Sequence, residues 1–292
     1  MSIFYKKGFD KLGNMLYNRS VKHDQTKIYL FFVSHMKGNM PMPRFFVRKE
    51  QIADGMIRIL GDDAHHIARS LRMAAGEKIT VCDMQRMEYQ CELVEFEDDK
   101  SVLARILTSR QMNTEPPFVA HLYQALPKGD KMDTVIQKAV ECGVASIVPF
   151  ESERCVVRCK PEQEDKKTER RQRIATEAAQ QCGRGSIPEV VPTCRFSDVL
   201  QRACAVDIPI FCYEGEDTVP LRQLLQQKRT QLPTDAAPTI SIVVGSEGGF
   251  SGAEAQAAKN AGFLMAGLGR RILRTETASS FVLSALVYEF EL

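Results

Sequence analysis

Strand-like and helical segments alternate from Phe118 to the end of the chain. The strand-like runs span 118–125, 146–150, 208–213 and 239–244, and the helical patterns span 131–142, 165–182, 220–227, 252–260 and 275–290. Short apolar runs that alternate with helices in this way are typical of a mostly parallel sheet with helices on both faces. Gly143 and Gly262 stand where two of these helices would end in a left-handed residue. The pattern predicts an α/β domain.

The residues before this region follow a period of two. Short strands are expected at 44–47, 56–60, 78–83, 88–96 and 101–107, with one helix at 62–71 that Asp62 would cap. About five short strands in roughly seventy residues suggest a small barrel. Thr114-Glu115-Pro116-Pro117 is a stiff, extended joint. We therefore predict a β-barrel domain at 42–113 and an α/β domain at 114–292.

Residues 1–41 differ from both domains in charge and in pattern. They hold seven Lys or Arg and two Asp, a net charge of +5, whereas the whole chain carries +2. Residues 42–292 therefore carry −3, so a nucleic acid would have to bind at a local patch and not to a globally positive surface. We interpret Met42 as the natural start and residues 1–41 as a non-native leader or a flexible extension. The alternative is a basic arm that binds RNA.

Composition limits the class of protein. Hydrophobic residues make up 44% and charged residues 26%, which excludes disorder, collagen and a coiled-coil rod for the chain as a whole. No apolar run approaches the roughly 20 residues of a membrane-spanning helix, so no membrane association is expected. The nine cysteines are too sparse for a disulfide scaffold and fit no metal-ligand spacing. Buried thiols in a reducing cytoplasm, with no metal, are the expected state.

A buried strand runs directly into a glycine turn near residue 245. Gly245-Ser246-Glu247-Gly248-Gly249 follows the strand, and Ser251 with Glu254 forms a capping box that starts a helix. Glycines let backbone amides approach a ligand closely, and α/β proteins bind cofactors at the carboxyl ends of parallel strands. The spacing fits neither a phosphate loop nor the dinucleotide-binding fingerprint. Considered alone, this segment is equally consistent with a tight turn that binds nothing.

A second unusual loop follows about twenty residues later. Leu268-Gly269-Arg270-Arg271-Ile272-Leu273-Arg274 holds three arginines within five residues, and Thr275 is the expected cap of the final helix. This loop falls on the same predicted sheet edge as the glycine loop. Two such loops at one edge favour a ligand-binding site over a solvated charge run.

The two loops together resemble the knotted SPOUT methyltransferases, and most closely the ribosomal RNA small subunit methyltransferase E family. The resemblance rests on the glycine loop and on the run Leu-Gly-x-Arg-Ile-Leu-Arg-x-Glu-Thr-Ala at 268–278. Four further stretches agree in order along residues 42–292, at 43–46, 65–72, 128–154 and 177–188. Three positions depart from the family pattern: Ser246 replaces a usual proline, Cys142 a leucine and Cys182 a serine.

This resemblance implies a SPOUT-type parallel sheet with a C-terminal deep trefoil knot, preceded by a PUA-like RNA-binding β-barrel. It implies S-adenosylmethionine as cofactor, 16S rRNA in the 30S subunit as substrate, and N3 of uridine 1498 as the methyl acceptor. It also implies a cytoplasmic homodimer in which each site is completed across the interface. The residues implied in cofactor binding are Tyr213, Glu214, Gly245, Ser246, Glu247, Gly248, Gly249, Leu268, Gly269, Ile272 and Leu273.

Methyl transfer to uracil N3 requires a proton acceptor, or a cation that stabilises the uracil anion, because N3 carries a proton at neutral pH. The catalytic candidates are Arg184, Arg274 and Glu276, and the sequence leaves open which group is the base. Glu276 also fits the first turn of a helix, where a carboxylate is favourable without any catalytic role. The candidates for RNA binding are Arg44, His65, His66, Arg69 and Arg72. His121, in a predicted buried strand, is expected to be a hydrogen-bonded core histidine.

Two other functions remain open at this stage. One is a non-catalytic RNA-binding or assembly factor, which blocked cofactor loops would favour. The other is a SPOUT methyltransferase for a different RNA position, because the fold does not fix the acceptor.

Overall fold

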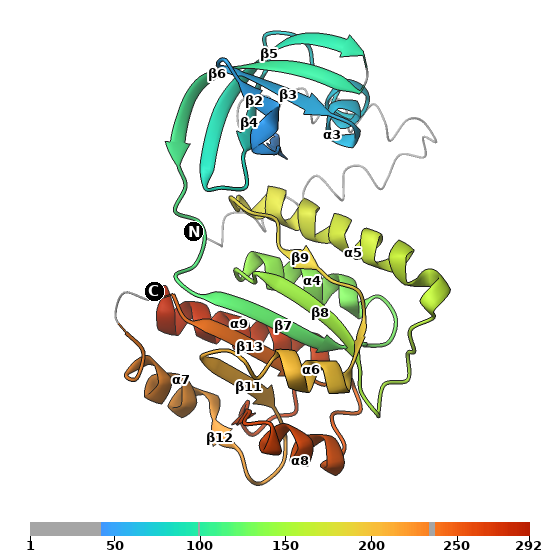
Figure 1. Ribbon diagram of the computed structural model, residues 1–292, viewed down its shortest axis with the longest axis vertical. Coiled ribbons are helices and arrows are strands. Elements are labelled where there is room, and N and C mark those ends of the chain that lie inside the picture. The colour runs from blue at the N-terminus through green and yellow to red at the C-terminus, as the bar shows by residue number, and fades with distance from the viewer. Residues whose placement is uncertain (1–41, 99, 234–236) are drawn as a thin grey trace, which may run out of the picture. The chain divides into compact units, whose positions relative to one another are not determined.

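The computed structural model describes residues 42–98, 100–233 and 237–292. The predictions for residues 1–41 lie outside the described residues. The N-terminal part of the described chain forms a six-stranded sheet in the order β1-β4-β5-β6-β3-β2 (Figure 1). Its strands are β1 (Arg44–Phe46), β2 (Ile52–Ala53), β3 (Met56–Leu60), β4 (Lys78–Cys82), β5 (Met87–Asp98) and β6 (Ser101–Gln111). All five predicted strands are present, and β2 is an addition too short to leave a periodic signal.

The helix predicted at 62–71 is shorter and less regular than expected. A single α-helical turn, α3 (Asp62–His65), continues as π-helical residues, η2 (His66–Ser70). Asp62 is not the cap. Gly61, whose φ is 67°, occupies the cap position directly before the helix. A further short helical turn, η1 (Lys49–Gln51), lies between β1 and β2.

The N-terminal sheet has its own apolar core. Alternate residues of β3 and of the first half of β6 are buried, as the period of two predicts, whereas the last four residues of β4 are all buried. The buried cluster consists of Phe45, Val47, Ile57, Ile59, Ala64, Ile67, Ile79, Val81, Cys91, Leu93, Val102 and Ala104. This core therefore closes within residues 45–104.

The C-terminal part is built on an eight-stranded sheet in which every pairing is parallel. The strands run in the order β10-β8-β7-β13-β11-β14-β12, and β9 pairs with β8. They are β7 (Val119–Ala125), β8 (Ser146–Glu151), β9 (Glu189–Val190), β10 (Cys194–Arg195), β11 (Ile208–Cys212), β12 (Val219–Pro220), β13 (Thr239–Val244) and β14 (Leu264–Gly267). The predicted α/β domain with a parallel sheet is confirmed.

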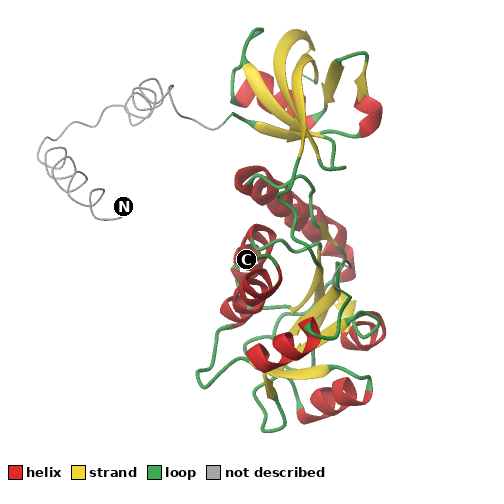
Figure 2. Ribbon diagram, turned by 90° about the vertical axis from the view of Figure 1, so that its left-hand side faces the viewer, coloured by secondary structure: helices red, strands yellow, loops and turns green. Residues whose placement is uncertain are grey.

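Helices lie on both sides of these parallel strands (Figure 2). They are α4 (Lys131–Glu141), α5 (Pro161–Cys182), α6 (Phe196–Arg202), α7 (Leu221–Arg229), α8 (Gly252–Asn260) and α9 (Thr275–Phe290). Helix α5 begins four residues earlier than predicted, at Pro161, because proline is well suited to the first helical position. The sequence analysis missed α6, whose single buried residue, Val199, gives no periodic signal.

The ends of two helices follow the sequence signals closely. Ser251 caps α8, its hydroxyl accepting from the backbone amide of Glu254, whose carboxylate accepts from the amide of Ser251. Gly262, with φ of 93°, follows the same helix, and Gly143, with φ of 83°, follows α4. The predicted capping box and the two left-handed glycines are confirmed.

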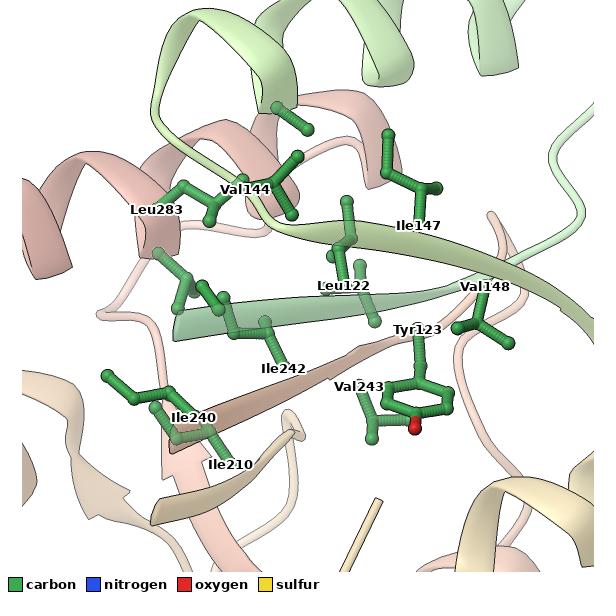
Figure 3. Close-up of a cluster of buried hydrophobic side chains, with 14 of the residues drawn as sticks. Leu122, Tyr123, Val144, Ile147, Val148, Ile210, Ile240, Ile242, Val243 and Leu283 are labelled. Carbon is green, nitrogen blue, oxygen red and sulfur yellow. The ribbon is translucent and has the colours of Figure 1, made fainter. Parts of the chain in front are cut away.

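Alternation along the central strands divides the core between the two faces of the sheet (Figure 3). Leu122 of β7, Ile147 of β8 and Ile242 of β13 lie on the side of Leu283, which belongs to α9. Their neighbours in sequence, including Tyr123 and Val243, lie on the opposite face. Because both faces are covered, these strands are mostly apolar and do not alternate between apolar and polar residues.

Several smaller expectations can be compared with the described residues. All nine cysteines are free thiols, but only Cys82, Cys91, Cys155 and Cys212 are buried and Cys182 is exposed, so the expectation of buried thiols holds in part. His121 is hydrogen-bonded, with Nδ1 2.7 Å from Oγ of Ser146. No helix among these residues is both long enough and apolar enough to span a membrane.

Candidate active site

Three loops meet at the carboxyl ends of neighbouring strands. Because β13, β11 and β14 are adjacent and parallel, the loops that follow them reach the same edge of the sheet (Figure 1). These loops surround a cavity of about 840 Å³. All eleven residues that the resemblance implies in cofactor binding line this cavity. Lys131 and Arg154 also line it, and the sequence analysis proposed a role for neither.

The glycine loop is a tight turn held by its own backbone. The amide of Gly249, whose φ is 64°, donates to the carbonyl of Ser246 at 2.9 Å. At Gly245 a Cβ atom would lie 3.1 Å from the Phe250 ring and 3.2 Å from the backbone of Gly249, so only glycine fits without displacement. Ser246 is buried and keeps the turn, although its family position usually holds proline.

A buried polar network fixes this loop to the strand beside it and to the last helix. The Thr275 hydroxyl donates to the carbonyl of Gly245 at 2.6 Å and accepts from the Gln124 amide at 2.8 Å. The other end of Gln124 accepts from the hydroxyl of Ser279 at 2.6 Å. Thr275 is therefore not the helix cap, because its hydroxyl is used in this network; Arg274 occupies the cap position.

Thr275→Val tests the network. The change keeps the shape of the side chain but leaves two buried groups, the Gly245 carbonyl and the Gln124 amide, without that partner. We expect a loss of about 2–4 kcal/mol in the free energy of unfolding, measured in urea. Thr108→Val at an exposed position of β6 is the matched control and should change stability by less than about 0.5 kcal/mol. Equal losses in the two variants would contradict the assigned network.

Lys131 lies between two carboxylates at the edge of the cavity. Its Nζ is 2.7 Å from Oε1 of Glu247 and 3.8 Å from Oε2 of Glu276. Burial by itself would raise the pKa of Glu247, but hydrogen bonds from Lys131 and from backbone amides outweigh it and hold the pKa below its ordinary value. Among the described residues, Oε2 of Glu276 is the buried side-chain oxygen or nitrogen that has no hydrogen-bond partner. Such an atom is suited to accept a hydrogen bond from a ligand.

The three catalytic candidates occupy different environments. Arg274 lines the cavity. Glu276 is not a lining residue, but its Oε2 is 3.8 Å from Nζ of Lys131, which lines the cavity. Arg184 does not line the cavity and is 5% exposed. Its guanidinium donates to the Glu115 carboxylate at 2.5 Å and to the carbonyl of Val144 at 2.5 Å. Since Nε, Nη1 and Nη2 are all engaged within the chain, this environment gives Arg184 a structural task and not a catalytic one.

The Arg184–Glu115 pair predicts a pH-dependent loss of stability. Burial would raise the pKa of Glu115, but hydrogen bonds and charge from Arg184, together with Ser186 and the amide of Gly185, hold it below the ordinary 4.5. The pair therefore stabilises fully above about pH 4.5, and its contribution disappears as the pH falls through the lower folded-state pKa.

Arg184→Met should lower the free energy of unfolding by about 3–5 kcal/mol at pH 7, because it leaves a buried carboxylate unpaired. The double variant Arg184→Met/Glu115→Leu should recover much of that loss. Urea unfolding of both variants from pH 7 to pH 3 measures the effect, and the deficit of the single variant should shrink below pH 4.5. A deficit that does not change with pH would contradict this role.

The predicted RNA-binding residues belong to the N-terminal sheet and its helical turn. Arg44 is partly buried, and its guanidinium is 2.7 Å from both the buried Glu88 carboxylate and Sγ of Cys82. Because its donors are directed inward, Arg44 is a weaker candidate than expected. His65, His66, Arg69 and Arg72 are all exposed. His66 also packs edge-on against Phe45.

The charge of the cavity differs from that of the chain around it. Five cationic side chains line it (Lys131, Arg154, Arg270, Arg271 and Arg274), against two carboxylates (Glu214 and Glu247). The lining is thus locally basic, whereas residues 42–292 carry −3. An anionic ligand would be attracted to this mouth specifically.

Two family descriptions match different parts of the chain. A family described as "RNA methyltransferase domain" matches residues 114–287, and one described as "RNA methyltransferase PUA domain" matches residues 59–107. The chain is 35% identical over 254 residues to ribosomal RNA small subunit methyltransferase E of Bacillus subtilis, covering 86% of this chain and 98% of that protein. The chain belongs to the ribosomal RNA small subunit methyltransferase E family. The resemblance drawn from the motifs is confirmed.

Two solved structures of methyltransferases share the fold as well. One is ribosomal RNA small subunit methyltransferase E from Neisseria gonorrhoeae, bound to S-adenosylmethionine, with a TM-score of 0.72, 30% identity and coverage of 85% of this chain and 97% of that one. Another is a putative methyltransferase from Legionella pneumophila in complex with S-adenosylmethionine, with a TM-score of 0.74, 30% identity and coverage of 85% and 98%.

Proposed function

We propose that this chain transfers a methyl group from S-adenosylmethionine to N3 of a specific uridine in 16S rRNA. The observation that carries the proposal is the convergence of the three predicted loops on one cavity, in a chain of this family. The unblocked cavity favours an enzyme over a non-catalytic assembly factor.

The residues around the cavity fit this cofactor. Gly245, Gly248 and Gly249 have no side chain, so a cofactor can approach their backbone groups closely. A Cβ at Gly245 would already be crowded by its neighbours. Glu214 follows a parallel strand, where a carboxylate is suited to bind ribose hydroxyls. Leu268, Leu273 and Ala278 supply apolar contact for a purine ring. When bound, the sulfonium supplies an electrophilic methyl group, and the protein needs to supply alignment and a deprotonated acceptor.

We assign the proton-accepting role to Glu276. Its buried Oε2 accepts no hydrogen bond and is 3.8 Å from Nζ of Lys131, so it is suited to accept the N3 proton of a uracil placed at the Lys131 edge of the cavity. Arg274, which lines the same cavity, is suited to stabilise the uracil anion through its positive charge. Because N3 lies on the pairing edge, the uridine must be unpaired or turned out of its stack first.

Recognition of the RNA is proposed to combine the basic cavity mouth with exposed residues of the PUA-like domain, His65, His66, Arg69 and Arg72. Since residues 42–292 are net acidic, affinity must come from a few placed contacts and not from a general positive field. The substrate would therefore be a shaped one, the 30S subunit, and the compartment the cytoplasm.

A homodimer is part of this proposal. Along α9 the exposed side chains Thr277, Phe281, Ser284 and Tyr288 recur on one face, and Tyr288 is 75% exposed. An exposed face that presents two aromatic rings on the last helix, those of Phe281 and Tyr288, is suited to a second copy of the chain. We also propose the deep trefoil knot and the division into domains at 42–113 and 114–292, as the family resemblance implies.

Methyl incorporation tests the substrate. The purified protein is incubated with tritium-labelled S-adenosylmethionine and one of three RNAs: 30S subunits from cells lacking the protein, protein-free 16S rRNA, or a short hairpin carrying the target sequence. We expect the highest rate on 30S subunits and a poor rate on the hairpin. Equal rates on all three would contradict the shaped-substrate proposal, and incorporation into none would contradict the proposed reaction.

A further inference from the structure

The loop after β8, residues 152–158, is fastened to the glycine loop and to α8. The amide of Glu153 donates to Oε1 of Glu254 at 2.7 Å, while the other oxygen of Glu254 caps the helix. Arg158 donates to the carbonyls of Ser152 and Glu153, both at 3.0 Å. The sequence analysis treated Glu254 as a cap only, but its carboxylate holds two loops together.

This attachment places Arg154 against the glycine loop. Its Nη1 donates to the carbonyl of Gly248 at 3.1 Å, and its own carbonyl accepts from the Ser246 hydroxyl at 3.5 Å. A Cβ at Gly248 would lie 3.0 Å from Cβ of Arg154 and 3.3 Å from its carbonyl oxygen, so the two loops are in close backbone contact. Arg154 is nevertheless exposed and lines the cavity.

The guanidinium therefore has one end fixed and the other available. Among the described residues, the guanidinium of Arg154 makes its hydrogen bond through Nη1, which leaves Nε and Nη2 without a partner. A planar guanidinium whose Nε and Nη2 are both free presents a fork of N–H donors that matches the oxygens of a phosphate or a carboxylate. Because the loop is already ordered, little conformational entropy is lost when such an anion binds.

The position of Arg154 at the sheet edge favours a phosphate over the cofactor carboxylate as its anion. Arg154 follows β8, whereas most residues assigned to the cofactor follow β11, β13 and β14. Strands β8 and β11 are separated by β7 and β13, so Arg154 stands on the side of the glycine loop away from Tyr213 and Glu214. Lys131, at the start of the helix after β7, is on this same side.

We propose that Arg154 binds a backbone phosphate of the RNA, at or next to the nucleotide that enters the cavity. This proposal rests on the proposed function. It assigns the nucleotide to the β7–β8 side of the sheet edge and the cofactor to the β11–β14 side. Arg154 is a binding residue here and takes no part in proton transfer.

The test compares Arg154→Gln and Arg154→Lys with Arg222→Gln, a control that removes the same charge from an exposed position on α7 outside the cavity. Binding to 30S subunits from cells lacking the protein is measured between 50 and 200 mM salt, and S-adenosylmethionine binding is measured by calorimetry. We expect Arg154→Gln to weaken 30S binding roughly 10- to 100-fold and to reduce the salt slope by about 0.7–0.9. Arg154→Lys should keep the salt slope but bind less tightly, because it retains the charge and loses the fork.

The affinity for S-adenosylmethionine distinguishes an Arg154 that binds an RNA phosphate from one that binds the cofactor carboxylate. Unchanged S-adenosylmethionine binding in Arg154→Gln supports the phosphate, whereas weakened cofactor binding with unchanged 30S binding would assign Arg154 to the cofactor carboxylate and overturn the proposal. A salt slope equal to that of Arg222→Gln would also overturn it. None of these measurements requires methyl transfer, so a wild-type protein that binds both ligands without reacting would refute the proposed reaction alone.

Discussion

Gly248→Leu is expected to abolish S-adenosylmethionine binding while leaving the protein folded. The first atom of any side chain at this position would lie 3.0 Å from Cβ of Arg154 and 3.3 Å from its carbonyl oxygen. Part of that contact is backbone, so the side chain cannot be accommodated by a rotamer change, and the glycine loop must shift. We expect the dissociation constant for the cofactor, measured by calorimetry, to rise at least about 100-fold.

Gly252→Leu is the matched control, four residues along the chain. A Cβ at Gly252 has no neighbour within 4 Å, and its φ lies outside the left-handed region. The same substitution there should leave cofactor affinity within about twofold of wild type. Wild-type affinity in Gly248→Leu would remove the glycine loop from the cofactor site.

Glu276→Gln is expected to lower kcat by about 10²–10⁴ while cofactor affinity is retained. The amide has nearly the same shape as the carboxylate but cannot accept the N3 proton. Glu291→Gln, which changes an exposed carboxylate just after the same helix, should have little effect. Single-turnover methyl transfer on 30S subunits measures the rate of the chemical step.

The unfolding free energy and the single-turnover rate of Glu276→Gln together distinguish a catalytic role of Glu276 from a role in packing. If Glu276→Gln lowers the free energy of unfolding but leaves the single-turnover rate intact, the residue stabilises the start of α9 and does not take the proton. In that case Arg274, which lines the cavity, becomes the leading catalytic residue.

Local sequence signals predicted the parts of the fold that local physics controls. The bounds of β13, α8 and α9 agree with the predicted residues, because a buried strand, a capping box and a long apolar helix each leave a strong pattern. Short elements such as β9, β10 and β12, of two residues each, have no period to detect.

The cavity was predicted in outline because two of its loops carry strong local motifs, and the family resemblance added the third, at Tyr213 and Glu214. Interactions across space were not predictable in the same way. Lys131 is more than a hundred residues from Glu247, and Gln124 more than a hundred from Thr275, so no local pattern connects them. Arg184 was named a catalytic candidate from its motif, but the fold buries it against Glu115, 69 positions away. A charged residue in a motif can serve the architecture, and only the partners of its side chain reveal which role it has.

Methylation of N3 of one uridine in 16S rRNA is the reaction that we propose for this chain. The most direct measurement is mass spectrometry of nucleosides and mapped fragments of 16S rRNA from cells with and without the protein. We expect one N3-methyluridine to be absent from 16S rRNA of cells that lack the protein. It should return when the wild-type chain is supplied, but not when Glu276→Gln is supplied. Retention of every N3-methyluridine in cells lacking the protein, or the loss of a different methylated nucleoside, would contradict it.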